Sequence, residues 1–136
     1  MPLKITDLPF NRFIGIDKRG ENVGLTKHDR LLNHVGSLHA AALYGLAEAA
    51  TGDWIIEHLM AHYPDALALA REGNIKYKRP AAEDCHAVVD VDQMAVEKCL
   101  SMLQRRGQGT LMISVQILSG DTLIATAAFK WWFSLK

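Results

Sequence analysis

The chain has 136 residues, and its fifteen basic and fifteen acidic side chains give a formal net charge of zero. A chain of this length fits one domain, residues 1–136, that can bury a sizeable core. A balanced charge provides no field that would recruit nucleic acid or an anionic membrane surface. No stretch approaches the roughly 18 consecutive apolar residues that a membrane-spanning helix needs. We therefore expect neither nucleic acid nor a membrane as a partner.

The first residues and the cysteines indicate a compartment. Residues 1–7 contain neither an apolar core nor a small-residue cleavage site, so they do not resemble a secretory signal. Cys85 and Cys99 do not have the spacing of a metal-binding pair. Two cysteines in a chain of this size are typical of a reducing interior. The sequence predicts a cytoplasmic protein without a bound metal.

The hydrophobic pattern predicts an α+β protein. Short strand-like pieces at residues 13–16 and 23–26 flank a turn. A very apolar helix follows over residues 39–50, and Gly52 is placed to end it. The later segments are, in chain order, a short helical pattern at 54–63, extended segments at 66–79 and 84–92, a helix around 96–103 that Gly107 ends, and a hairpin of strands 109–118 and 122–133 that turns at Gly120-Asp121. An antiparallel sheet that curls around the apolar helix is the economical way to bury it.

The expected sheet also predicts self-association. One short sheet around one helix leaves an open edge. A strand such as residues 84–92 would close that edge by pairing with its copy. We therefore expect a homodimer or a homotetramer.

Glu48 is the most informative residue of the apolar helix. Between Val35 and Gly52 it is the only residue with a formal charge. A run that is apolar on every side belongs inside a protein. A carboxylate in such a run must be stabilised by partners or shift toward its neutral form. Glu48 is therefore either a surface residue on a helix with a narrow polar side, or part of a working site.

The residues around the helix start suit acyl chemistry. If the helix begins near His39, the first free amides are those of about Ala40 and Ala41, and the positive helix end favours a carbonyl oxygen that acquires charge. Asn33 offers a donor and an acceptor that can orient a water. Glu48 lies nine residues after His39, so it reaches a substrate that lies alongside the helix or a site that a second subunit completes.

Together these groups predict hydrolysis of an activated acyl group. A thioester is the expected electrophile, because no serine or cysteine nucleophile with a histidine partner is evident. Each residue also has an ordinary structural alternative: His39 packing on the sheet, Asn33 in a turn. Three polar residues that converge on one helix end favour the functional interpretation.

Together with Gly36, the residues Asn33, His39 and Glu48 resemble the pattern of hotdog-fold acyl-CoA thioesterases. The phenylacetate-pathway and hydroxybenzoyl-CoA types are the most similar, since their helix opens with His-Gly-Gly and carries an Asp or Glu nine residues after the histidine. Residues 76–81 resemble the Tyr-x-x-Pro-Ala segment of the same family, and the element order agrees over nearly the whole chain.

The resemblance implies roles for individual residues. Glu48 would be general base or nucleophile, the Ala40 amide would hold the oxyanion, and Asn33 would hold the water, while His39 shapes the helix start. Gly36 and Ala41 would lie against the substrate. Two departures stand out. The family's His-Gly-Gly is His39-Ala40-Ala41 here, and a Ser or Thr that often assists on the next strand corresponds to Ala70.

Basic residues near the end of the extended segment suit the phosphates of coenzyme A; they are Lys76, Lys78 and Arg79. A solvated strand end is the alternative for them. The expected partner is thus an acyl-CoA or acyl-carrier thioester, with coenzyme A as part of the substrate and no separate cofactor. His58 and His62 lie one helical turn apart, but Glu57 precedes them in the wrong order for a zinc-protease motif. The alternative function is a non-catalytic domain that binds or senses acyl-CoA, for which Glu48 would have no use.

Overall fold

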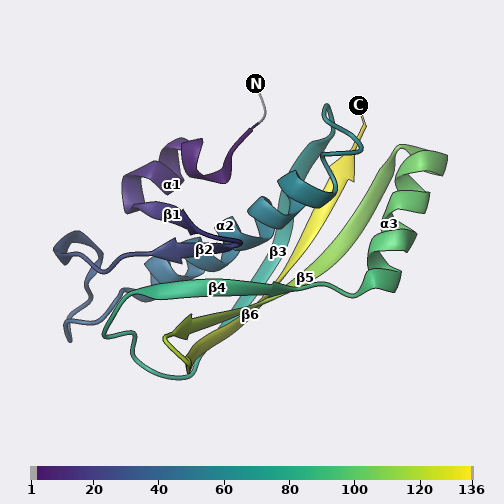
Figure 1. Cartoon of the computed structure of the whole chain (residues 1–136). Coiled ribbons are helices and arrows are strands. Elements are labelled where there is room, and N and C mark those ends of the chain that lie inside the picture. Colours follow the sequence, from purple (N-terminus) through teal and green to yellow (C-terminus); the bar gives the residue numbers. More distant parts are fainter. Residues whose placement is uncertain (1–2, 136) are drawn as a thin grey trace.

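The computed structural model describes residues 3–135, which form a six-stranded antiparallel sheet around a long helix (Figure 1). The order of strands in the sheet is β1-β2-β4-β5-β6-β3. The strands are β1 (Ile16–Arg19), β2 (Asn22–Leu25), β3 (Leu67–Tyr77), β4 (Cys85–Asp90), β5 (Gln108–Ser119) and β6 (Thr122–Ser134), and the long helix is α2 (Ala40–His58). This arrangement confirms the predicted α+β class and the hotdog fold. None of the helices in residues 3–135 has the length and apolar character needed to cross a membrane.

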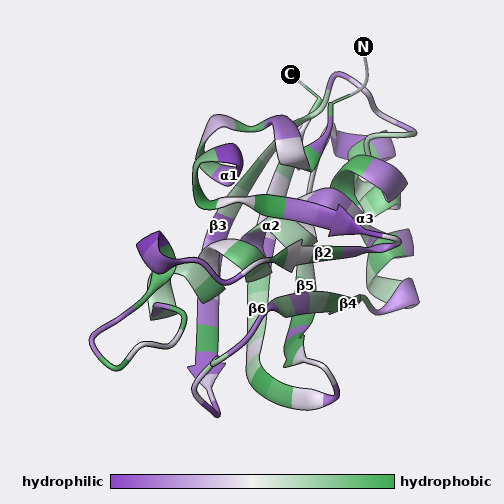
Figure 2. Cartoon of the chain, turned by 60° about the vertical axis from the view of Figure 1, so that its left-hand side comes forward, coloured by the Kyte–Doolittle hydropathy of each residue, from purple (hydrophilic) through white to green (hydrophobic). Residues whose placement is uncertain are grey.

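The core lies between α2 and the concave face of the sheet. Strand β5 alternates exposed and buried residues along most of its length, and Figure 2 shows the corresponding bands of hydrophilic and hydrophobic residues. Its inward residues pack against the helix through Ile113, Val115 and Ile117. Helix α2 is buried on several sides at once, because Leu46, Ala47 and Ala49 are all fully covered. A helix without a polar face can exist only inside such a wrapped sheet.

Helix α2 is longer than the sequence predicts. Gly52 does not end it, and the separate helical pattern expected at 54–63 is instead the last part of α2, which ends at His58. A Cβ added at Gly52 would lie 2.9 Å from Cδ1 of Ile5. The glycine therefore lets the N-terminal segment pack directly on the helix backbone, and this contact offsets the roughly 1 kcal/mol that glycine costs inside a helix.

The N-terminal segment differs from the predicted strand at residues 13–16. A 3-10 turn (Ile5–Asp7) leads into a short helix, α1 (Pro9–Ile14), and the first strand begins only at Ile16. Pro9 stands at the start of α1, where its missing N–H is not needed, and Gly15 ends the helix with a φ of 88°. The Nδ2 group of Asn11 donates to the carbonyl of Ile5 at 2.9 Å and joins the turn to the helix.

The predicted pairing of residues 84–92 with a second copy is wrong. Strand β4 lies inside the sheet, paired with β2 on one side and β5 on the other. The free edges belong to β1 and β3. Beyond Asp90 and Ser114, where β4 and β5 separate, helix α3 (Gln93–Arg106) packs along β5. Of the two edge strands, β3 is therefore the one long enough to pair with a second chain, since it has eleven residues.

A buried hydrogen bond joins α2 to β6, and a second hydrogen bond within α2 continues from it. The indole N–H of Trp131 donates to the hydroxyl of Thr51 at 2.9 Å. That hydroxyl donates in turn to the carbonyl of Glu48 at 2.7 Å. Thr51 is completely buried, so neither group can exchange its partner for water. The position of Glu48 along the sheet is thus set by a side chain one helical turn away.

Removing the Thr51 hydroxyl should destabilise the fold. Thr51→Val keeps the shape of the side chain but leaves the buried Trp131 N–H without an acceptor, which costs about 1–3 kcal/mol. Urea unfolding followed by circular dichroism measures this loss. Thr51→Ser, which keeps the hydroxyl, should lose less. In the double variant Thr51→Val/Trp131→Phe both partners are gone, so its loss should be smaller than the sum of the single losses. Strict additivity would show that the bond does not link the two elements.

Candidate active site

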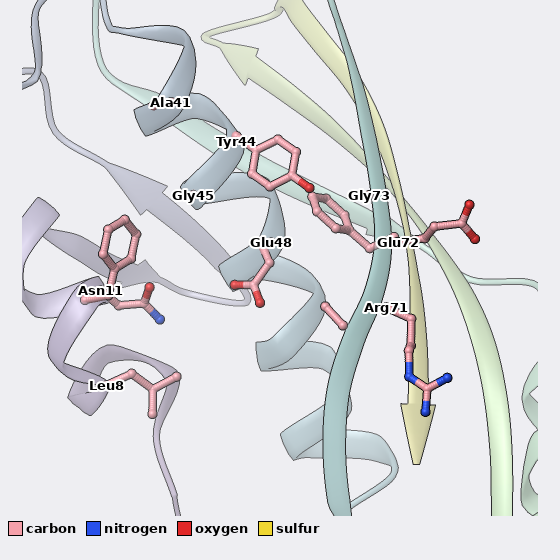
Figure 3. Close-up of a pocket in the computed structure, with 12 residues that line it drawn as sticks. Leu8, Asn11, Ala41, Tyr44, Gly45, Glu48, Arg71, Glu72 and Gly73 are labelled. Atoms are coloured by element: carbon pink, nitrogen blue, oxygen red, sulfur yellow. The ribbon is translucent and has the colours of Figure 1, made fainter.

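The carboxylate of Glu48 faces a cavity of about 580 Å³ between α1, α2 and β3 (Figure 3). Tyr44, one turn before Glu48, lines the same cavity and packs edge-on against Phe129, with ring centroids 5.2 Å apart. The opposite wall is β3 from Ala70 to Gly73. A Cβ at Gly73 would overlap the Tyr44 hydroxyl and the Phe129 ring, so glycine leaves the space that these two side chains occupy.

A bulge in β3 lies beside this cavity. The pairing of β3 with β6 shifts register between Ala70 and Glu72, which leaves Arg71 as the extra residue. The Arg71 guanidinium turns away from Glu48 and lies 4.6 Å from the centroid of the Trp132 ring (Figure 3). No hydrogen bond or ion pair to the Glu48 carboxylate comes from residues 3–135. Burial in these apolar surroundings raises the pKa of Glu48 above its ordinary value.

The start of α2 presents one free amide where the sequence predicted two. His39 is the N-terminal cap, and its Nδ1 accepts the N–H of Ala41 at 2.9 Å. The N–H of Ala40 donates to no group within residues 3–135. Tyr77, at the end of β3, donates its hydroxyl to the carbonyl of Ala40 at 3.0 Å and holds the helix start against the strand. Ala40 is therefore the residue whose amide is available to a ligand.

Asn33 is part of a closed loop before the helix. Its Oδ1 accepts the backbone N–H groups of Val35 and Ser37 at 3.0 and 3.1 Å. Its Nδ2 donates to the Ser37 hydroxyl at 3.0 Å, and Gly36 has a φ of 79° that few other residues adopt. The side chain of Asn33 thus shapes the loop that leads into α2.

Most of the predicted residues line two different cavities of one chain. Asn33 and Ala40 line a second cavity of about 300 Å³ with Lys78 and Arg79, whereas Glu48 and Ala41 line the first. Glu48 lies eight residues after Ala40, which corresponds to about 12 Å along the helix axis. Lys76 lies on the other face of the sheet, because side chains alternate along β3 and Tyr77 faces the helix.

Helix α1 and its residues in the Glu48 cavity were not predicted from the sequence. Phe10 and Asn11 both line it, and Asn11 is only 3 % exposed. The signal for this helix was present, since Pro9 and Gly15 stand at the two positions that begin and end it. Residues 13–16 were predicted as a strand because of their apolar pattern, so the helix was not predicted.

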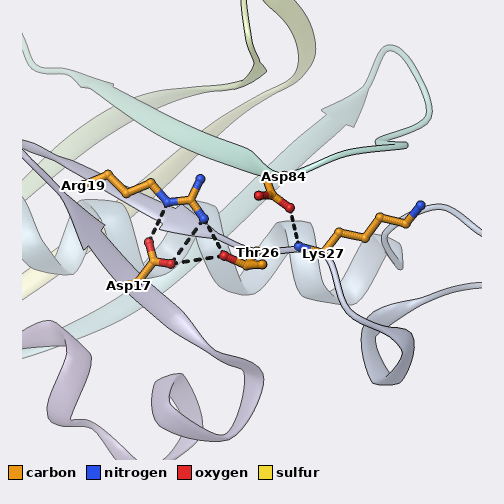
Figure 4. Close-up of polar contacts among 5 residues, drawn as sticks. All are labelled: Asp17, Arg19, Thr26, Lys27 and Asp84. Carbon is orange, nitrogen blue, oxygen red and sulfur yellow. Dashed lines mark hydrogen bonds and ion pairs between the residues drawn. The ribbon is translucent and has the colours of Figure 1, made fainter.

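A polar network lies on the β1–β2 hairpin, away from the Glu48 cavity. On the β1–β2 hairpin, Arg19 donates to Asp17 and Thr26, both at 2.8 Å, and the Lys27 N–H donates to Asp84 before β4 (Figure 4). Cys85 and Cys99 are buried, and burial raises the pKa of each thiol to about 11. Within residues 3–135 no three His, Cys, Asp or Glu side chains are grouped to hold a metal ion.

The wrapped helix and the sheet order define a hotdog-fold protein, and comparison with known proteins gives its family. The family model described as Domain of unknown function (DUF4442) matches residues 12–133, so the chain belongs to this family. No curated protein matched the sequence.

Solved structures share the fold at low sequence identity. A Pseudomonas aeruginosa protein of unknown function, named as a probable thioesterase, is 18 % identical, with a TM-score of 0.83 over 98 % of this chain and 97 % of that one. A Bacillus halodurans protein crystallised with CoA is 16 % identical, with a TM-score of 0.70 over 91 % and 74 %. A mutant of the phenylacetic acid degradation protein PaaI from Thermus thermophilus is 20 % identical, with a TM-score of 0.62 over 93 % and 99 %.

The environment of Glu48 predicts how stability depends on pH. Its pKa is higher in the folded protein than in the unfolded chain, so the folded state binds more protons between the two values. Stability contributed by this group therefore falls as the pH rises from the ordinary carboxyl pKa through the folded one, and stays reduced above it. Glu48→Gln should be more stable than the wild type at pH 7, and the difference should shrink toward pH 4. Urea unfolding between pH 4 and 8 tests this, and a less stable variant at pH 7 would contradict it.

Proposed function

We propose that this protein hydrolyses an acyl-CoA or acyl-carrier thioester. The observation that carries the proposal is the Glu48 carboxylate, which faces an apolar cavity without a protein partner. Maintaining an unpaired carboxylate there costs stability. Such a loss of stability is expected at a site where the charged group takes part in a reaction. The solved structures support the same reaction class, since one with this fold is named as a thioesterase and another contains CoA.

In the proposed reaction, the free Ala40 amide and the positive end of α2 stabilise the thioester oxygen as it becomes negative. As general base, Glu48 takes a proton from the attacking water, and the sulfur leaves with that proton as a thiol when the carbon–sulfur bond breaks. As nucleophile, Glu48 attacks the carbonyl carbon itself and expels the thiolate; water then hydrolyses the acyl–Glu48 anhydride, and its proton passes to the thiolate. Lys78 and Arg79, beside Ala40 in the second cavity, suit the phosphates of coenzyme A.

The two halves of the site meet if two chains pair along the free edge of β3. The Glu48 cavity lies beside residues 70–73, and the Ala40 half lies beside Tyr77. Antiparallel pairing of two β3 strands about residue 74 sets residue 77 of one chain opposite residue 71 of the other. The Ala40 amide of one chain then comes next to the Glu48 cavity of its partner. A homodimer, or a tetramer built from such dimers, is therefore the proposed working form.

Replacing the carboxylate tests the chemistry. Glu48→Gln keeps the size of the side chain but cannot accept a proton, so kcat should fall by at least ~10²-fold. KM should change little, because the charge acts mainly in the transition state. Release of free thiol from a panel of acyl-CoA thioesters measures both constants. A variant that keeps wild-type turnover on its best substrate, while the protein still binds CoA, would favour the non-catalytic acyl-CoA sensor.

A subunit-mixing experiment tests the shared site. Ala40 is the first residue of α2, and His39 before it is already extended (φ −62°, ψ 142°), so Ala40→Pro removes the amide and leaves the helix intact. This variant alone should lose ~10²-fold or more in kcat. Mixed randomly with Glu48→Gln chains, it should recover about a quarter of wild-type activity, because half of the dimers then contain one complete site. If a single chain holds the whole site, the mixture will stay inactive.

A further inference from the structure

Helix α1 contributes one polar side chain, Asn11, to the mostly apolar cavity that Glu48 faces. Asn11 is 3 % exposed and lies opposite the Glu48 carboxylate, with its amide directed into the cavity (Figure 3). Its Nδ2 donates to the Ile5 carbonyl at 2.9 Å. A carbonyl can only accept, so this bond fixes which end of the amide is nitrogen. The Oδ1 atom accepts no hydrogen bond from residues 3–135 and remains available to the cavity.

We propose that Asn11 holds the hydrolytic water for Glu48 within the same subunit. This inference rests on the proposed thioester hydrolysis, with Glu48 as general base. A water between the two side chains donates one O–H to the Glu48 carboxylate and the other to Oδ1 of Asn11. With both hydrogens directed to acceptors, a lone pair of the water oxygen is left to face the acyl carbon. Two acceptors on opposite walls therefore orient the nucleophile, as well as binding it.

The step balances without another reactant. The water oxygen forms a bond to the acyl carbon while its proton passes to Glu48, and the carbonyl electron pair moves onto the oxygen held by the Ala40 amide. When that pair returns, the carbon–sulfur bond breaks, and the proton on Glu48 neutralises the leaving sulfur. The products are a carboxylic acid and a thiol. Asn11 takes up no proton at any stage, because its role is to accept a hydrogen bond.

Asn33 is less suited to this task. Its Oδ1 already accepts from the N–H groups of Val35 and Ser37, so the acceptor that a water would need is occupied. Asn11 also reaches the Glu48 cavity from the same chain, whereas Asn33 lines the other cavity. The carboxylate and its water-holding amide are thus placed together before any partner subunit is added.

Four variants, compared with the wild type and Glu48→Gln on one acyl-CoA substrate, test the assignment. Asn11→Ala removes the acceptor, so kcat should fall about 10- to 100-fold with KM nearly unchanged. Asn11→Asp sets a second carboxylate across the cavity, so the acid limb of the pH–rate profile should move to higher pH. Ile5→Ala loosens the same N-terminal segment but keeps the Asn11 amide, so it should show neither the large fall nor the pH shift. Asn22→Ala, on β2, is the matched asparagine control and should behave as wild type.

The outcomes separate this inference from the proposed function. If Glu48→Gln is inactive but Asn11→Ala turns over like the wild type, hydrolysis by Glu48 stands and the role of Asn11 is wrong. Equal losses in Ile5→Ala and Asn11→Ala, with an unshifted profile in Asn11→Asp, would make Asn11 purely structural. A wild type that releases no thiol from any acyl-CoA overturns both. Should Asn11→Ala fail to fold, the pH profile of Asn11→Asp decides the question alone.

Discussion

The burial of α2 is the constraint on which the rest of the structure depends. The helix is apolar around most of its circumference, so the sheet must curl until it covers several of its sides. Apolar contacts alone would leave such a helix free to slide, because alanines and leucines offer little directional preference. The Trp131–Thr51–Glu48 hydrogen bonds remove that freedom at one level of the sheet. Glu48 is held at this level, so the position of its carboxylate follows from the packing of the core.

The sequence predicted this architecture well where one rule determined the structure. Strict alternation along β5 and the Gly120 turn identified the last two strands, and Gly107 ended α3 as expected. Prediction from the sequence failed where a local preference competes with a long-range contact. Gly52 looks like a helix end by local preference, but in the fold it serves a close contact with Ile5 that lies far away in sequence. The assignment of 84–92 as an edge failed because strand order depends on long-range pairing.

The residues of the candidate site were also predicted where one local signal sufficed and were not predicted where long-range packing decided. Glu48 was recognisable because a single charge in an apolar run has few explanations. The residue pattern alone predicted free amides at Ala40 and Ala41, and the family resemblance assigned the oxyanion to Ala40. That the Ala41 amide is not free depends on the rotamer of His39, whose ring accepts it. Asn11 was not found, because nothing in the local sequence indicates that a six-residue helix near the N-terminus folds back over the middle of α2.

The two cysteines have a practical consequence for chemistry on this protein. Only the thiolate form reacts readily with disulfide reagents and maleimides, and a pKa of about 11 leaves very little thiolate at neutral pH. Both side chains are also buried, Cys85 on β4 beside Leu25 of β2 and Cys99 between α3 and β5. The native protein should therefore react very slowly with thiol-specific dyes. A cysteine introduced at an exposed position such as Met94 would then be a unique attachment point for a fluorophore or spin label.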